Sequence, residues 1–228
     1  LRTQEIVTRE ALMRWRHPTR GMVPPGVFIP IAEQSGLIAG MGDWAIAQAC
    51  LDAAKWPDGV GVSVNVSPLQ FREPLRLVQT VKDALLAANL TPGRLTLEVT
   101  ESLLIEDNKA TLELINELRA IGIKFALDDF GTGYSSLAYL STYPFAQVKI
   151  DQSFAREVHT NEASKAVIEA VCQLARRLQM NVVVEGIETE QQRIAVQLLG
   201  AHRAQGFLFG RPEALASIKG RNGNRSVA

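Results

Sequence analysis

Within residues 124–136, an apolar run that ends at Leu127 is followed by two adjacent carboxylates, Asp128 and Asp129. Thr132, which has a glycine on each side, comes shortly after them. Neighbouring carboxylates repel each other, and a divalent cation is a common way of keeping both ionised. An aspartate before a glycine turn is also common at the start of a helix, and that simpler interpretation would be favoured for this segment alone. The metal interpretation is preferred because several other predicted strands end in the same way.

Polar side chains lie at or just beyond the carboxyl ends of these strands. In chain order they are Glu10, Arg14, Asn65, Ser67, Glu98, Glu101, Asp128, Asp129, Lys149, Asp151, Glu185, Glu188 and Gln205. A parallel barrel builds its active site at that end, so we expect these residues to converge. Their oxygen atoms suit hard cations rather than zinc. His17, His159 and His202 fall outside the set, and His17 before Pro18 is predicted to be a turn residue.

The chemistry indicated is metal-assisted phosphoester hydrolysis. Acidic oxygens with one amide suit two Mg²⁺ or Mn²⁺ ions about 4 Å apart, which serve in-line displacement at phosphorus. Lys149 and Asp151 are two residues apart and share a strand face, where the lysine could act on a water or simply form a salt bridge. Arg14 is four residues after Glu10 in a predicted strand, so the two would share a face, and a guanidinium there suits phosphate binding.

The elements that would position these residues alternate between strand and helix. Strands are predicted at residues 10–15, 60–66, 94–99, 123–127, 146–150, 181–184 and 205–209. Helices are predicted at residues 29–35, 41–55, 74–89, 109–120, 162–179 and 190–199, with a short one after Tyr134. The strands read as near-continuous apolar runs, which is typical of strands covered on both faces. The pattern predicts one α/β domain over residues 1–215 and a frayed tail at 216–228.

Seven strands are predicted, whereas a closed barrel of this type has eight. Either the sheet is open, or a strand that precedes Leu1 is missing from this chain.

Composition is that of an ordinary globular protein, with 24 acidic and 24 basic side chains and 46% hydrophobic residues. Zero formal net charge argues against binding of a DNA or RNA duplex. No apolar run reaches the roughly 18 residues of a membrane span. Cys50 and Cys172 lie in apolar, helix-like contexts and are predicted to be buried thiols rather than a disulfide.

Taken in order, these motifs resemble the EAL domains, the bacterial cyclic di-GMP phosphodiesterases. The resemblance covers almost the whole chain. It is carried by the segments Glu10-Ala11-Leu12 with Arg14, Phe28-Ile29-Pro30, Ala32-Glu33, Val64-Asn65-Val66-Ser67, Glu98-Val99-Thr100-Glu101, Asp128-Asp129-Phe130-Gly131-Thr132-Gly133, Lys149-Ile150-Asp151, Glu185-Gly186-Ile187-Glu188 and Gln205-Gly206.

The resemblance implies a TIM-like (β/α)8 barrel that hydrolyses cyclic di-GMP to linear pGpG with two divalent cations, Mg²⁺ or Mn²⁺. It implies that one metal is held by Glu10, Asn65, Glu98 and Asp128, and the other by Asp128, Asp129 and Glu185. Lys149 would contact the nucleophilic water, with Glu185, Glu188 and Gln205 supporting the catalytic step. Substrate contacts are implied for Leu12, Arg14, Ser67, Asp151 and Gln205, and Glu101 would brace the loop at residues 131–136.

The family normally has a helix and a strand ahead of the Glu10-Ala11-Leu12 segment, and these match the eighth strand that the count requires. The resemblance further implies a homodimer, fusion to GGDEF or sensory domains, and a cytoplasmic location, which could be within a membrane-anchored sensor. Some members bind cyclic di-GMP or other proteins without turnover, but the complete acidic set favours an enzyme. An open-sheet nucleotide binder is disfavoured because the phosphate-loop ending is absent, and a kinase because the catalytic-loop motif is absent.

Overall fold

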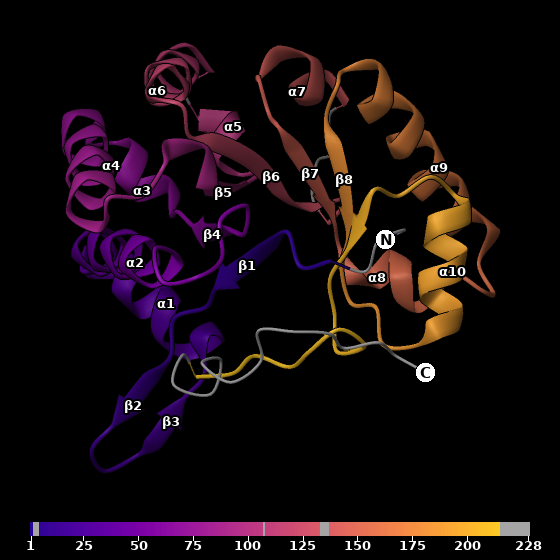
Figure 1. Ribbon diagram of the computed structural model, residues 1–228, viewed down its shortest axis with the longest axis horizontal. Coiled ribbons are helices and arrows are strands. Elements are labelled where there is room, and N and C mark those ends of the chain that lie inside the picture. Colours follow the sequence, from indigo (N-terminus) through magenta and orange to yellow (C-terminus); the bar gives the residue numbers. More distant parts are fainter. Residues whose placement is uncertain (2–4, 107, 133–136, 215–228) are drawn as a thin grey trace.

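The molecule is built around a curled sheet with helices along its outer side (Figure 1). The computed structural model describes residues 1, 5–106, 108–132 and 137–214. Within them the sheet has seven strands, arranged in space in their chain order: β1 (Thr8–Ala11), β4 (Gly61–Asn65), β5 (Leu95–Thr100), β6 (Lys124–Phe130), β7 (Gln147–Ile150), β8 (Asn181–Val184) and β9 (Arg203–Ala204). All neighbouring strands in the sheet are parallel. This confirms the predicted barrel-type α/β fold.

Across the described residues, β1 and β9 are the two edges of this sheet, so the barrel is open between them. The side chains nevertheless meet across the opening, because Nε2 of Gln205, just after β9, donates to Oε2 of Glu10 in β1 at 2.6 Å. That residues 1–215 form one domain stays a prediction, and the tail at 216–228 lies outside the described residues.

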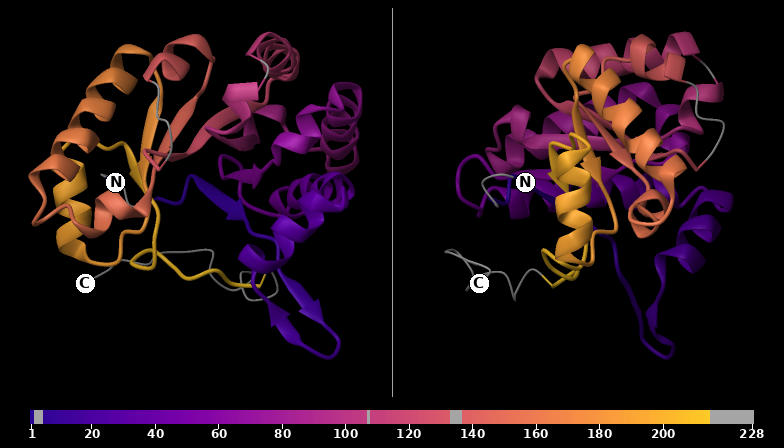
Figure 2. Two further views of the ribbon diagram at one scale, coloured as in Figure 1. Left: turned by 180° about the vertical axis from the view of Figure 1, so that it is seen from behind. Right: turned by 90° about the vertical axis from the view of Figure 1, so that its right-hand side faces the viewer.

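Helices connect the strands and pack on the outer side of the sheet (Figure 2). They are α1 (Pro25–Gln34), α2 (Ile38–Ala53), α3 (Pro68–Phe71), α4 (Pro74–Ala88), α5 (Leu103–Glu106), α6 (Asn108–Ile121), α7 (Leu137–Thr142), α8 (Gln152–Arg156), α9 (Glu162–Arg177) and α10 (Glu190–Leu198), with the 3-10 turn η1 (Pro92–Arg94). The longer helices were predicted within a few residues of these bounds. The short helices α3, α5 and α8 were not predicted, because one or two turns leave little periodic pattern.

Side chains alternate across the strands and so separate the core from the concave face. Val62 and Val64 of β4 are almost fully buried on the helix side, while Ser63 and Asn65 point the other way. In β5 the buried Leu97 likewise alternates with Glu98. The strands are covered on both faces, as predicted, since the inward-facing Ser63 and Glu98 are as buried as the outward-facing valines and leucines. The concave face differs from the helix side in that it also carries polar side chains.

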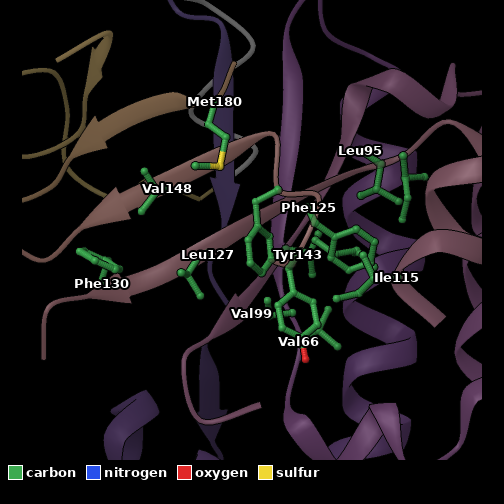
Figure 3. Close-up of a cluster of buried hydrophobic side chains, with 14 of the residues drawn as sticks. Val66, Leu95, Val99, Ile115, Phe125, Leu127, Phe130, Tyr143, Val148 and Met180 are labelled. Atoms are coloured by element: carbon green, nitrogen blue, oxygen red, sulfur yellow. The ribbon is translucent and has the colours of Figure 1, made fainter. Parts of the chain in front are cut away.

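The hydrophobic core lies between the sheet and the helices (Figure 3). Phe125 and Leu127 of β6 are fully buried there, with Val99 of β5 and Tyr143 after α7 in the same cluster. The ring of Phe71 in α3 meets Phe125 edge-on, with centroids 6.5 Å apart. Each such fully buried side chain contributes on the order of 2 kcal/mol through the hydrophobic effect. This packing fixes the outer face of the strands, and with it the direction of the polar inner residues.

The first strand is shorter than predicted. β1 ends at Ala11, and Trp15–His17 forms β2 of a separate antiparallel hairpin with β3 (Gly21–Val23). His17 stabilises the turn of this hairpin, where its Nδ1 accepts the backbone N–H groups of Thr19 and Arg20, each at 3.2 Å. The prediction that His17 is itself a turn residue was wrong, because His17 is the last residue of β2 and the turn comprises residues 18–20. Arg14 lies between the two strands, so the prediction that it shares a strand face with Glu10 was wrong.

Strand β6 is longer than predicted and irregular. It continues beyond Leu127 to Phe130, and its pairing with β7 shifts register between these two residues. Asp129 occupies this bulge with a left-handed backbone (φ 53°), which aspartate tolerates better than most residues. Asp128 and Asp129 therefore lie within the last three residues of the strand rather than beyond its end.

The last strand also differs from the prediction. β9 comprises Arg203 and Ala204, so Gln205 follows the strand instead of opening it, and residues 205–209 are not a strand. A turn forms there, in which the N–H of Phe209 donates to the carbonyl oxygen of Gly206 at 3.1 Å. Cys50 and Cys172 are both buried free thiols, as predicted. Among the described helices, none is both long and apolar enough to cross a membrane.

Candidate metal and catalytic site

A buried lysine, Lys149, lies at the centre of the concave face. The ammonium of Lys149 in β7 is 2.8 Å from Glu185 Oε1, 2.9 Å from Glu98 Oε2 and 3.0 Å from Asp128 Oδ1. Oε2 of Glu10 is 3.6 Å away. These residues come from β1, β5, β6, β7 and the end of β8, at the carboxyl ends of the parallel strands. The predicted convergence of these five side chains is therefore present.

The cluster carries more negative charge than the lysine can offset. Burial raises the pKa of Glu98 to about 8, although the ammonium of Lys149 acts in the opposite direction. Burial likewise raises the pKa of Glu185 to about 7, and the charge of Asp128 adds to this effect. The pKa of Lys149 lies well above its ordinary value because the surrounding carboxylates outweigh its own burial. Further positive charge at this site would relieve the repulsion among the carboxylates.

A second acidic group lies beside the lysine. Carboxylate oxygens of Asp128, Asp129 and Glu185 lie within 4.8 Å of one another. The pKa of Asp129 is raised, chiefly by burial and next by the charge of Asp128. One ammonium, that of Lys149, cannot balance three convergent carboxylates. Their oxygen atoms form a donor set that suits a hard divalent cation. The chemistry of these residues thus fits the metal type predicted from the sequence.

Two amides orient Glu10. Nδ2 of Asn65 donates to Glu10 Oε1 at 2.7 Å, and Nε2 of Gln205 donates to Oε2 at 2.6 Å. Asn65 and Glu98 are direct partners in the register of β4 and β5. Both amides predicted for the site are therefore in contact with its first carboxylate, and they bring β1, β4 and the segment after β9 together.

Other predicted residues occupy supporting positions. Glu101 Oε1 accepts the backbone N–H of Gly131 at 3.1 Å, which joins the segments after β5 and β6; the rest of the loop, residues 133–136, lies outside the described part. Asp151 caps α8 by accepting the N–H of Ser153 at 2.9 Å. Glu188 follows β8 and is exposed. Its backbone N–H donates to Oε1 of Gln192 at 2.8 Å.

Three residues predicted to bind substrate make their contacts elsewhere than with the carboxylate cluster. The hydroxyl of Ser67 already donates to Glu33 Oε1 at 2.8 Å and caps α3. Leu12 and Arg14 are exposed between β1 and β2, and the Arg14 guanidinium donates to the carbonyl oxygen of Met13 at 2.9 Å. No contact within the described residues joins these two to the carboxylate cluster.

No role was predicted for Glu33 or Gln192 from the sequence. Glu33 anchors Ser67, two residues after Asn65, and Gln192 accepts hydrogen bonds from the backbone beside Glu188. Glu33 lies in the Ala32-Glu33 segment that resembles the EAL domains. Gln192 lies three residues after Thr189, which is the spacing of a helix-capping box. That spacing was the available signal for Gln192.

Comparisons with known proteins agree with this fold. A family profile described as EAL domain matches residues 1–212. MucR of Pseudomonas aeruginosa, a bifunctional diguanylate cyclase and cyclic di-GMP phosphodiesterase, is 43% identical over 217 residues, covering 92% of this chain and 32% of MucR. The chain belongs to the EAL domain family. It spans about a quarter to a third of the length of the first curated relatives it matches (27%, 26% and 32%).

Solved structures show the same architecture. The P. aeruginosa MucR phosphodiesterase in complex with c-di-GMP superposes with a TM-score of 0.87 at 41% identity, covering 93% of this chain and 87% of that one. BlrP1 of Klebsiella pneumoniae, solved with calcium and c-di-GMP, superposes with a TM-score of 0.81 at 32% identity, covering 92% of this chain and 52% of that one. These similarities confirm the family suggested by the sequence motifs.

Proposed function

We propose that this domain hydrolyses cyclic di-GMP to linear pGpG with the aid of two divalent cations. The observation that carries the proposal is the contact of one buried ammonium, that of Lys149, with carboxylates from four other strands or strand ends. Support also comes from the phosphodiesterase named among its relatives and from the EAL structures that hold c-di-GMP.

The chain's own residues divide into two proposed ligand sets. Glu10, Asn65, Glu98 and Asp128 would hold one cation, and Asp128, Asp129 and Glu185 the other. Bound there, Mg²⁺ or Mn²⁺ would polarise the phosphodiester and stabilise the negative charge that develops during in-line displacement. The excess of buried carboxylate over ammonium in this cluster agrees with such binding.

Lys149 is proposed to orient the attacking water and to stabilise developing charge, since its buried ammonium is held among four carboxylates. Glu185 and Glu188 are proposed to assist the proton transfer that accompanies attack. Gln205 keeps Glu10 oriented through its amide and is close enough to the site to contact substrate as well.

Substrate contacts are proposed for Leu12, Arg14, Ser67, Asp151 and Gln205. Arg14 is exposed and its guanidinium has N–H groups beyond the one that donates to Met13, which would be available to a phosphate of a bound dinucleotide. Ser67 would contribute through the position of the segment that follows Asn65, because its hydroxyl is already held by Glu33. Glu101 is proposed to brace the loop after β6.

The assembly and setting of the domain are also proposals. We propose a homodimer and a place within a longer protein that carries GGDEF or sensory domains, as the bifunctional description of MucR suggests. Hydrolysis of a bacterial second messenger would place the domain in the cytoplasm, which includes the cytoplasmic part of a membrane-anchored sensor.

The competing candidate is a receptor that binds cyclic di-GMP without turnover. Incubation of the protein with cyclic di-GMP in Mg²⁺, in Mn²⁺ and in EDTA, followed by chromatography, distinguishes the two. The phosphodiesterase proposal predicts pGpG with either metal and none in EDTA. Binding measured by equilibrium dialysis without any product in metal would support the receptor and contradict the enzyme.

A further inference from the structure

The side-chain amide of Gln192 in α10 joins two segments that carry site residues. Gln192 is 9% exposed. Its Oε1 accepts the backbone N–H groups of Glu188 at 2.8 Å and Thr189 at 3.0 Å, and its Nε2 donates to the carbonyl oxygen of Ala155 at 3.3 Å. One buried side chain thus contacts the segment after β8 and helix α8, which follows β7.

Part of this arrangement is an ordinary helix cap. Thr189 Oγ1 accepts the N–H of Gln192 at 3.2 Å, and Gln192 Oε1 accepts that of Thr189, which together form a capping box. The bonds to Glu188 and Ala155 lie outside that box. They connect the cap to a proposed catalytic residue and to a neighbouring helix, so capping alone does not account for them.

The segment that Gln192 contacts is closely packed against its surroundings. Gly186 lies so close to Gln152 of α8 that a Cβ at this position would collide with it. The N–H of Ile187 donates to the carbonyl oxygen of Gln205 at 3.0 Å. Gln192 adds the hydrogen bond that fixes the next peptide, that of Glu188. Because the Glu188 side chain is exposed, its position depends mainly on this backbone.

We propose that Gln192 is a positioning residue that fixes the backbone of Glu188 relative to helix α8, the segment after β7. Asp151, the proposed substrate contact, caps the same helix α8 whose Ala155 carbonyl Gln192 binds. Gln192 therefore couples the residues contributed after β7 to those contributed after β8. This inference rests on the proposed function, since it assigns Glu188 a part in turnover.

The test compares Gln192→Met, which removes all three hydrogen bonds at similar volume, with Thr189→Ala, which removes the threonine half of the capping box. Gln192→Met is expected to lower kcat for cyclic di-GMP by at least about tenfold, the scale of supporting-residue effects, with KM within about threefold. Thr189→Ala is expected to lower the melting temperature but keep kcat within about twofold. Gln192→Glu keeps acceptors for both N–H groups and is expected to recover part of the loss.

A readout independent of turnover is hydrogen exchange of the Glu188 and Thr189 amides, which should be slow in the wild type and fast in Gln192→Met. The inference is overturned if Gln192→Met keeps kcat within twofold of wild type, or if Thr189→Ala loses as much kcat. A wild-type protein without turnover would instead contradict the proposed function. In that case unchanged exchange of the Glu188 amide in Gln192→Met would overturn the positioning role, and accelerated exchange would support it.

Discussion

Nζ of Lys149 lies 2.9 Å from Oε2 of Glu98, and these side chains are only 2% and 1% exposed. An ion pair this deeply buried is costly to form, and removing one partner leaves the other charge without compensation. Lys149 also faces Glu10, Asp128 and Glu185, so its charge is shared among four carboxylates. Loss of the Lys149 charge should therefore lower the stability of the fold, whereas binding of a cation to the same carboxylates should raise it.

Lys149→Met should destabilise the metal-free protein by about 3–5 kcal/mol, because buried carboxylates lose their counter-charge. Mg²⁺ should restore part of this stability by supplying positive charge to the same carboxylates. Urea unfolding in EDTA and in Mg²⁺ measures both effects. The matched control is Lys165→Met, which removes the more exposed pair with Glu162 and should change stability by about 0.5 kcal/mol or less. Equal losses for the two variants would contradict the buried role of Lys149.

Asp128→Asn should abolish most turnover while the fold is retained. The change preserves shape but removes the carboxylate charge shared by both proposed ligand sets, so kcat should fall about a thousandfold. Circular dichroism and a chromatographic assay in Mg²⁺ measure structure and turnover on the same sample. Wild-type activity in Asp128→Asn would show that the ligand assignment is wrong.

Gly206→Ala should disturb the segment that carries Glu185 and Glu188. Gly206 has a positive φ of 154°, and a Cβ there would collide with the backbone of Ile187. Overpacking of this kind costs about 1–3 kcal/mol, and activity should fall as the segment moves. Gly210→Ala is the control, since a Cβ at that position meets nothing within 4 Å. If both variants unfold at the same urea concentration as the wild type, the close approach is not restrictive.

The two cysteines should be unreactive in the folded protein. Burial raises the pKa of both Cys50 and Cys172 from 9.0 to about 11. At pH 8 the folded protein should react with a thiol reagent roughly a hundredfold more slowly than the unfolded chain, because its thiolate fraction is lower. Reaction of both thiols should become fast in guanidinium chloride.

The same shift gives the thiols a pH-dependent contribution to stability. Their folded pKa exceeds the unfolded value, so the contribution is complete below about pH 9 and is lost as the pH rises towards 11. Replacement of both by serine should flatten this alkaline decline in urea unfolding. An unchanged decline in the double variant would assign it to other groups.

Much of the site was predictable because it depends on one rule of topology. Parallel strands bring their carboxyl ends together, so Glu10, Asn65, Glu98, Asp128 and Lys149 could be grouped from the sequence alone. Their mutual contacts follow from strand alternation, which sets the polar face opposite the buried core.

What the sequence missed was set by local backbone geometry and by long-range contacts. Residues 10–15 read as one strand, but the chain leaves the sheet after Ala11 to form the hairpin around His17. The bulge at Asp129 depends on the pairing of β6 with β7. The bond from Gln192 to Ala155 spans 37 positions in the chain, and no local pattern indicates it.

The most direct test of the metal-dependent site is the binding of Mn²⁺ measured together with turnover in the wild type and Asp128→Asn. Electron paramagnetic resonance of free Mn²⁺ gives the number of ions bound per chain, and chromatography of the same samples gives pGpG formed. We expect about two ions per wild-type chain with metal-dependent pGpG, and fewer ions with almost no product for Asp128→Asn. Turnover that persists in EDTA, or full Mn²⁺ binding by Asp128→Asn, would contradict a metal-dependent site at these residues.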